Sequence, residues 1–239
     1  MQRYFSCSKE EIMISPDDVH HILNVMRQRV GDFFEVVFNE KIYEMRITST
    51  KPFSYEVCDI SSTNNELEND VTLFYCLSKG DKNEFVMQKA TELGVKRIVL
   101  LSSKRSIAKM SNEDFLRKKE RFLKILKEAS EQSKRNIVPE ILGVYSVSKI
   151  PNELLAKHNF VAYEEDSGLT DNTFSLFNEI KKDESVSILI GSEGGLAKEE
   201  ITYLNSIGFK NISLGKRILR TETASIYALS VLSFFLERK

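Results

Sequence analysis

The chain has 239 residues, 41% of them hydrophobic, so it is long enough to bury one substantial core or to divide into two modest domains. Its 34 Lys and Arg residues nearly balance its 35 Asp and Glu residues, which excludes a uniformly basic coat for nucleic acid. It contains no apolar run of about 18 residues and its first residues do not resemble a secretory signal, so we expect a cytoplasmic protein without a membrane segment.

The cysteines and histidines indicate neither a disulfide framework nor a metal site. Cys7, Cys58 and Cys76 are odd in number and form no CxxC pair, so we expect free thiols. The three histidines lack partner ligands at helical or hairpin spacing. We therefore expect no metal.

Residues 1–70 begin with one predicted helix. Ser15 is a good N-cap, Pro16 suits the first helical position, and Gly31 ends the segment. Three apolar residues repeat at the spacing of a buried helical face: Val19, Ile22 and Met26.

The rest of this segment is predicted to be β structure. Runs of β-branched and aromatic residues predict strands at 33–38, 42–47 and 55–60, with a turn at 39–40. The polar stretch 61–66 is typical of a linker. We therefore expect a small β-barrel domain over 1–70, which carries 7 basic and 13 acidic residues.

A strand–helix–strand pattern starts the second segment, 71–239. A strand is predicted at 71–77, a helix at 83–93 that stops at Gly94, and a strand at 97–101. Ser111 can cap a long helix that ends before Pro139 and turns five apolar residues inward: Phe115, Phe122, Ile125, Leu126 and Ala129.

Further short apolar strands are predicted at 160–163, 187–190 and 211–214. Continuous apolar strands separated by helices indicate an α/β domain with a parallel sheet covered on both faces. Within it, residues 79–135 carry 16 basic and 8 acidic residues. This stretch is either a docking surface for a polyanion or a solvated helix face.

A glycine-rich loop follows the strand at 187–190. Residues 190–195 read IGSEGG, and glycine lets a ligand approach bare backbone. Ligands of open α/β sheets bind at the carboxyl ends of the strands. The loop is neither a dinucleotide fingerprint nor a phosphate loop, so by itself it fits a ligand site or a tight turn equally well.

A second glycine-bearing loop favours the ligand site. Residues 214–224 read LGKRILRTETA and lie between a predicted strand and a terminal helix. The inner side of that helix is predicted from five residues: Ala224, Tyr227, Ala228, Val231 and Phe235. Two such loops at the ends of two parallel strands can form one pocket that offers backbone hydrogen bonds to a purine.

These loops, together with three further stretches, resemble the RsmE family of ribosomal RNA small-subunit methyltransferases, which belongs to the SPOUT class. The further stretches are KGDKNEFVMQKATELGV at 79–95, EASEQSKRNIVPE at 128–140 and HHILNVMRQRVGD at 20–32. The resemblance runs in order along nearly the whole chain. The family usually has Pro where Ser192 stands, and often Phe-Ser at positions 196–197, where this chain has Leu-Ala.

The resemblance implies a SPOUT parallel sheet with a C-terminal trefoil knot, which binds S-adenosylmethionine (SAM), and a PUA-like barrel for RNA at the N-terminus. It further implies a homodimer that methylates N3 of a uridine in 16S rRNA or the small ribosomal subunit. In this class the cofactor is held largely by main-chain atoms, so replacing Gly194 or Gly215 should damage binding more than truncating Ile218.

The resemblance also assigns residues. The cofactor-binding set is Leu189, Ile190, Gly191, Glu193, Gly194, Gly195, Leu214, Gly215, Ile218, Leu219, Arg220, Thr221, Thr223 and Ala224. Arg220 is expected to orient the base, and Glu222 or Glu193 to accept its N3 proton. Basic residues expected to contact RNA are Arg3, Arg27, Arg29, Lys79, Lys82, Lys104 and Arg105.

Two other functions stay open at this point. Another SPOUT enzyme that modifies tRNA or a ribose oxygen would share the cofactor loops, but not the matches at 20–32 and 128–140. A non-catalytic RNA-binding assembly factor would keep the barrel and lose the cofactor. A nucleotide-dependent oxidoreductase is disfavoured, since its dinucleotide fingerprint is absent. Each function that includes RNA binding predicts an RNA affinity that falls steeply as the salt concentration rises.

Overall fold

A computed structural model of the chain describes residues 1–163 and 170–238. Its contacts divide the chain into two compact units. Unit 1 consists of Met1–Glu66 and Lys127–Val138, and unit 2 of Leu67–Leu126 and Pro139–Lys239. The first break follows the polar stretch at 61–66. Residues 127–138, which the sequence placed in the second domain, make their contacts with unit 1.

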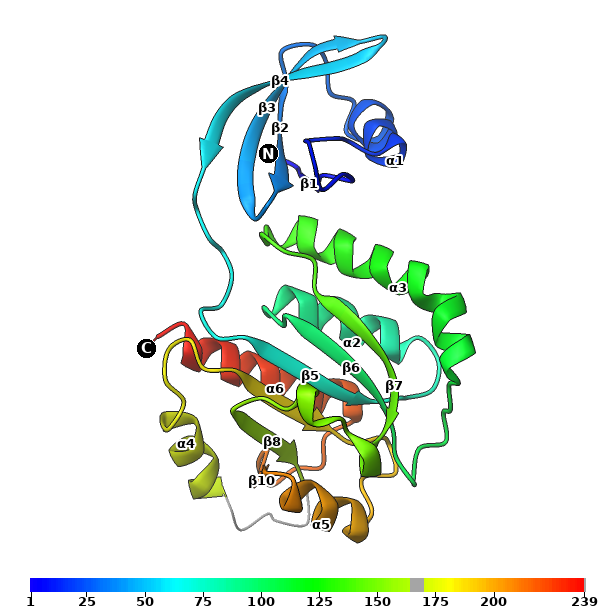
Figure 1. The fold of residues 1–239 in the computed structure, drawn as a ribbon, viewed down its shortest axis with the longest axis vertical. Coiled ribbons are helices and arrows are strands. Elements are labelled where there is room, and N and C mark those ends of the chain that lie inside the picture. The colour runs from blue at the N-terminus through cyan, green and yellow to red at the C-terminus, as the bar shows by residue number, and fades with distance from the viewer. Residues whose placement is uncertain (164–169, 239) are drawn as a thin grey trace. The chain divides into compact units, whose positions relative to one another are not determined.

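Unit 1 is built on a four-stranded sheet in the order β1-β2-β3-β4 (Figure 1). Its strands are β1 (Arg3–Phe5), β2 (Phe33–Phe38), β3 (Lys41–Thr50) and β4 (Phe53–Ser61). The three predicted strands are confirmed. Strand β1, too short to carry a pattern, was not predicted; it pairs in parallel with β2, whereas the other pairs are antiparallel.

The predicted helix is present but shorter than expected. Ser15 caps α1 (Pro16–His20) by accepting a 3.1 Å hydrogen bond from the Asp18 N–H, as its position in the sequence indicates. The chain then widens into one π-helical turn, η1 (His21–Val25). The N–H of Met26 donates to the carbonyl of His21, five residues back. The wider turn shifts the helical face, so the prediction of a buried Met26 is wrong: the residue is 46% exposed.

A buried ionic cluster joins α1 to residues 127–131 within unit 1. The Lys127 ammonium lies 2.6 Å from Asp18 Oδ1 and 3.3 Å from Glu131 Oε1. Burial raises the pKa of Glu131 to about 7, and the neighbouring Asp18 charge adds to the rise while Lys127 opposes it. Burial also raises the pKa of Tyr4, which the charges of Glu131 and Asp18 push further upward.

This cluster predicts a pH dependence of stability. The folded-state pKa of Glu131 lies above its ordinary value of 4.5, so its contribution to stability is complete below about pH 4.5 and is lost as the pH rises through about 7. We expect Glu131→Gln to remove this loss, on the order of 2 kcal/mol between pH 5 and pH 8. Denaturant unfolding at both pH values measures this change in the free energy of unfolding. Glu128→Gln, an exposed position on the same helix, should keep the wild-type slope; an equal effect of both variants would contradict the prediction.

Unit 2 contains a six-stranded sheet in the order β10-β8-β9-β5-β6-β7, with every neighbouring pair parallel. The strands are β5 (Val71–Cys76), β6 (Arg97–Ser102), β7 (Glu140–Ser146), β8 (His158–Ala162), β9 (Val186–Ile190) and β10 (Phe209–Ile212). The predicted parallel α/β sheet is therefore confirmed. Strands β8 and β10 each begin two residues earlier than expected. The edge strand β7, which contains Gly143 and is mostly half-buried, was not predicted.

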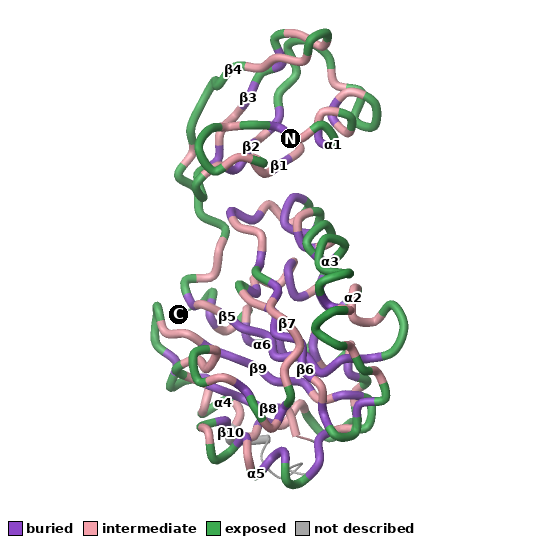
Figure 2. Tube along the Cα trace, turned by 45° about the vertical axis from the view of Figure 1, so that its right-hand side comes forward, coloured by how far each residue is buried: buried purple, intermediate pink, exposed green. Residues whose placement is uncertain are grey.

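The helices of unit 2 cover both faces of this sheet. They are α2 (Lys82–Glu92), α3 (Asn112–Gln132, whose last residues belong to unit 1), α4 (Thr170–Asn178), α5 (Lys198–Ser206) and α6 (Thr221–Leu236), with short 3₁₀ turns η2 (Val147–Lys149) and η3 (Asn152–Leu154). Helix α2 packs against α6, and α5 packs near β10. The central strands β5, β6 and β9 are buried along most of their length (Figure 2).

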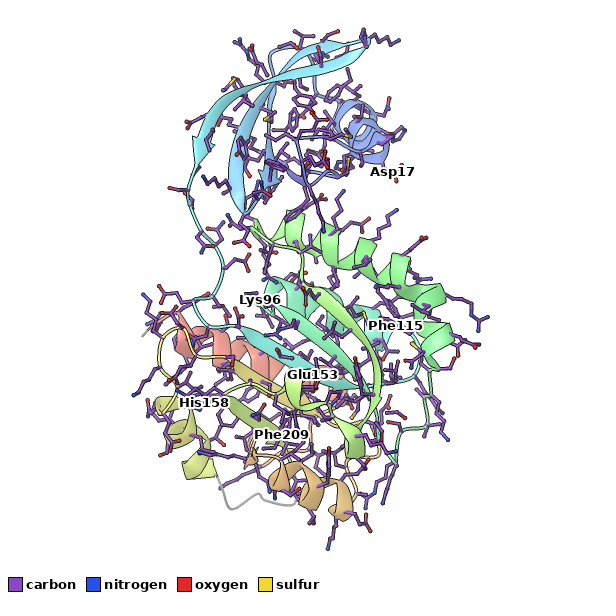
Figure 3. All side chains as sticks on the ribbon, viewed as in Figure 1. Asp17, Lys96, Phe115, Glu153, His158 and Phe209 are labelled. Carbon is purple, nitrogen blue, oxygen red and sulfur yellow. The ribbon has the colours of Figure 1, made fainter. Side chains whose placement is uncertain are left out.

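One face of the sheet shows how strand alternation builds the core. Phe74 and Cys76 of β5 join Leu204 of α5 in one buried cluster, in which Phe74 meets Phe209 of β10 edge to face at 5.8 Å. Figure 3 labels Phe209, which lies on the edge strand β10. Because successive strand residues point to opposite faces, Tyr75 faces the other side. The trefoil knot that the resemblance implies stays a prediction.

Helix α6 turns a different face inward than its spacing predicts. Tyr227 and Val231, expected inside, are 46% and 42% exposed. Ala228 is buried as predicted, and Ala224 and Phe235 are half-buried. The rest of the buried face is made by Ser225, Leu229, Leu232 and Leu236. Because the helix is apolar on nearly every side, periodicity cannot choose between its faces. Among the described residues, no helix is long and apolar enough to cross a membrane.

Candidate cofactor and substrate site

Three chain segments meet at the carboxyl edge of the unit 2 sheet. Strand β9 leads into the glycine loop at 191–197, and β10 leads into the loop at 213–220. Strand β8 lies between β9 and β10 in the sheet and ends beside both loops. The N–H of Tyr163, just after β8, donates a 3.1 Å hydrogen bond to the carbonyl of Ile212. The two loops are thus held on either side of the end of β8.

These segments enclose a cavity of about 720 Å³, counted to its open mouth. The lining residues that the resemblance assigns to the cofactor are Ile190, Gly191, Gly195, Leu214, Gly215, Ile218, Leu219, Thr221 and Ala224. Both glycine loops therefore contribute to one cavity, the arrangement expected from the sequence.

The backbone of the two loops explains the need for glycine. Gly195 and Gly215 have φ angles of 70° and 102°, in the left-handed region that side chains rarely adopt. Around Gly215, a position for a Cβ atom would meet nothing within 4 Å, so the main chain faces open space. Such a wall lets an adenosine moiety approach the main chain closely. The residues present therefore fit SAM.

Five of the assigned cofactor residues do not line the cavity. The Leu189 side chain is fully buried in the sheet core, so the contact expected of Leu189 could come only from its main chain. Thr223 faces a groove along α6 instead. Glu193, Gly194 and Arg220 lie outside the lining, and Gly194 packs against Arg105, whose Nη1 lies 3.5 Å from the Gly194 carbonyl oxygen.

Several lining residues were not foreseen as cofactor contacts. They are Arg105, Ala162, Tyr163, Ser192, Leu196, Ser213 and Arg217. Ala162 and Tyr163 come at the end of a strand that was predicted, so the rule that ligands bind at strand carboxyl ends was a signal for them. Arg105 had been assigned to RNA, and the sequence holds no signal that its loop folds over the cofactor cavity.

A Lys82-centred cluster joins the proposed catalytic carboxylates. The Lys82 ammonium lies 3.4 Å from Glu193 Oε1 and 3.4 Å from Glu222 Oε2. Burial pulls the pKa of Glu193 upward, but hydrogen bonds from its own N–H, the Lys79 N–H and the Lys82 ammonium outweigh burial and lower the pKa. Glu222 Oε2 is buried and accepts no hydrogen bond from the described residues.

Arg220 sits at the N-terminus of α6, where its backbone forms the N-cap and its side chain is exposed. Its carbonyl accepts a 2.7 Å hydrogen bond from the Ala224 N–H. A structural ion pair was the alternative to a role in catalysis. In the part of the chain that the structure describes, Arg220 makes no ion pair, so its guanidinium is available to a ligand.

The basic residues expected to contact RNA differ in their exposure and in their partners. Arg3 is corrected: it is 4% exposed, lies 2.8 Å from Glu35 Oε2 and donates to the carbonyl of Arg135, so it is engaged inside unit 1. Arg27 and Arg29 are exposed in the segment that follows η1.

The remaining four lie in unit 2. Lys79 is exposed after β5, and Lys82 is held by the two carboxylates described above. Lys104 lies 3.6 Å from Glu199 Oε2 at the surface. Arg105 lines the cofactor cavity. All four therefore lie on loops or a helix start near the carboxyl edge of the sheet.

Comparisons with known proteins agree with this geometry. A family described as an RNA methyltransferase domain matches residues 65–233, and one described as an RNA methyltransferase PUA domain matches residues 14–54. The ribosomal RNA small subunit methyltransferase E of Bacillus subtilis is 37% identical over 98% of this chain and 96% of its own length. The protein of the same name from Buchnera aphidicola of Schizaphis graminum is 32% identical over 96% and 93%.

A solved structure extends the likeness to three dimensions. The ribosomal RNA small subunit methyltransferase E from Neisseria gonorrhoeae, bound to S-adenosylmethionine, has a TM-score of 0.81 and 27% identity. The alignment covers 98% of this chain and 97% of that one. Together with the two family matches, these relatives establish that the chain belongs to the RsmE family of ribosomal RNA small subunit methyltransferases.

Proposed function

We propose that this RNA methyltransferase, which uses SAM, places the methyl group on N3 of a specific uridine in 16S rRNA. The observation that carries the proposal is the single cavity that both glycine loops enclose at the carboxyl edge of the sheet. Relatives named for small-subunit rRNA match nearly the whole chain, which supports the same class of substrate. A cytoplasmic location follows from a substrate of this kind.

The residues of the cavity divide the work of binding. The glycine loops supply main-chain donors and acceptors, and Leu196 and Leu219 supply apolar wall. When bound, SAM supplies an activated methyl group, so the remaining tasks are to align the nucleophile and remove the N3 proton. A uridine must be unpaired to enter, because N3 is occupied in a base pair.

The charged residues beside the cavity are proposed to orient the uracil base and to accept its N3 proton. Arg220 orients it and stabilises the negative charge that develops as the N3 proton leaves. Glu193 is a weak base, since hydrogen bonds hold its pKa low. Glu222 Oε2 is buried beside the same Lys82 ammonium and accepts no hydrogen bond from the described residues, so Glu222 is the other candidate for the proton acceptor. Lys82 contacts both carboxylates and positions them.

The test compares rRNA nucleosides by mass spectrometry in cells with and without the gene. We expect deletion to remove one N3-methyluridine from 16S rRNA and the wild-type gene to restore it. Arg220→Ala should methylate about 100-fold more slowly, the usual cost of removing a group that stabilises developing charge. Arg117→Ala, an exposed arginine of α3 paired with Asp114, should restore methylation fully. Unchanged nucleosides in the deletion strain would contradict the function, and full rescue by Arg220→Ala would remove Arg220 from the mechanism.

A homodimer is proposed from the exposed face of α6. A groove runs along this helix, and four of its large apolar side chains are 42% to 59% exposed. These are Phe85 of α2 with Tyr227, Val231 and Phe234 of α6. Contiguous apolar surface of this kind marks an interaction site. A second copy of the chain can cover it through the same face, as in a two-fold symmetric dimer.

RNA contact is proposed for both domains, 1–70 and 71–239. In unit 1, Arg27 and Arg29 are exposed, and the PUA family match covers their segment. In unit 2, Lys79 and Lys104 are exposed: the Lys79 N–H donates to Glu193 in the glycine loop, and Lys104 precedes Arg105, which lines the cofactor cavity. Because phosphate contacts release counterions, RNA affinity should fall steeply between low and moderate salt.

A further inference from the structure

A second cavity lies beside the cofactor cavity in unit 2. It measures about 980 Å³ counted to its open mouth, and it lies between the β5–α2 connection, the β6–α3 connection and α3. Figure 1 shows these three segments. Half of the residues that line the cavity are charged: Lys79, Asp81, Glu84, Lys109, Lys118 and Arg121. Of these, the family resemblance assigned only Lys79, as an RNA contact, and none lines the cofactor cavity.

The cavity carries a positive charge that the protein does not neutralise. Arg121 Nη2 lies 2.8 Å from Glu84 Oε2, so these two charges cancel. Three ammonium groups then face the single carboxylate of Asp81. In the described ranges, Lys79, Lys109 and Lys118 form no ion pair. Cations gathered around a hollow without counter-charges attract an anion from solution.

The second cavity is joined to the cofactor loops by two short links. The Lys79 N–H, on its rim, donates a 3.2 Å hydrogen bond to Glu193 Oε1 in the glycine loop. Arg105 lines the cofactor cavity and Ala108 lines the second one. Three residues of chain span at most about 11 Å. One RNA strand can therefore reach from the first cavity into the second.

We propose that the second cavity binds a backbone phosphate of the substrate rRNA adjacent to the target uridine, through Lys79, Lys109 and Lys118. The inference rests on the proposed function and extends it to a second subsite. Lysines act on phosphate as mobile point charges and carry no base recognition. The contact therefore fixes the register of the strand, so that the uridine, and not its neighbour, enters the cofactor cavity.

The test uses the full chain and small ribosomal subunits from cells that lack the gene. We expect Lys109→Ala/Lys118→Ala to lower subunit affinity on the order of tenfold at moderate salt and to reduce the slope of log K against log salt by about two. SAM affinity, measured by calorimetry, should not change. Lys109→Arg/Lys118→Arg should restore most of the affinity and the slope. Lys119→Ala, the next residue on α3 and outside the cavity, is the matched control.

Any of three results would overturn the inference. The first is a double alanine variant that binds subunits as tightly as wild type, and the second is a Lys119→Ala variant that loses as much affinity as Lys118→Ala. The third is micromolar binding of inorganic phosphate or uridine monophosphate to wild type that the double alanine variant lacks. The last result would make the cavity a site for a small phosphate compound. Failure of the proposed function is distinguishable, because wild type would then bind subunits without methylating them.

Discussion

Gly194→Ala is expected to weaken SAM binding on the order of 10- to 100-fold, the equivalent of about 1–3 kcal/mol of overpacking. An added Cβ at this position would lie 2.8 Å from the backbone oxygen of Arg105 and 3.0 Å from its Cβ. Neither atom belongs to a flexible chain end, so the two loops must separate. Because Arg105 and the neighbouring Gly195 both line the cofactor cavity, its walls move with them.

Ile218→Ala is the matched control for this effect. Ile218 lines the same cavity but is 84% exposed, so truncation leaves the loops in place. We expect its SAM affinity to fall by less than about threefold, measured by calorimetry beside Gly194→Ala. Thermal unfolding of both variants separates a local change at the loops from general destabilisation. Equal SAM affinity of Gly194→Ala and wild type would show that close packing of the loops does not shape the site.

Val231→Asp is expected to convert the proposed dimer into monomers. Val231 lies on the exposed face of α6, between Tyr227 and Phe234 along the helix. In a two-fold dimer each copy would bury an unpaired carboxylate there, which costs several kcal/mol. The dissociation constant should therefore rise on the order of 100-fold or more.

Sedimentation at micromolar concentration measures this change. Leu116→Asp provides the control, since Leu116 is a 64% exposed apolar residue of α3, away from this groove. It should leave the dimer intact. Wild-type protein that sediments as a monomer, or a Val231→Asp variant that still dimerises, would contradict the assignment of this face to a second copy.

Local sequence patterns predicted most of the fold because the strands are continuous apolar runs and the helices carry clear end signals. Ser15 and Ser111 both cap helices through their side chains, and Gly94 stops α2 with a φ of 87°. The failures have a common physical origin. Strand β1 is defined by its partner β2, and the inward face of α6 by what packs on it, so neither is encoded in local periodicity.

The cofactor site was predicted to the level of its loops. The two glycine motifs name segments that do meet in one cavity, because parallel strands bring their carboxyl ends to the same edge. The sequence did not predict where individual side chains of the site lie. Arg3 was expected to contact RNA at the surface but is buried against Glu35. Arg105 was also expected to contact RNA, but it lines the cofactor cavity. Both outcomes depend on contacts between residues far apart in the chain.

A crystal structure of the full chain with SAM would show where the cofactor binds. We expect the adenosine moiety between residues 189–195 and 214–224, hydrogen-bonded to main-chain groups beside Gly195 and Gly215. Cofactor bound elsewhere on the chain, or these two loops moved apart so that they no longer enclose a nucleoside, would contradict this expectation.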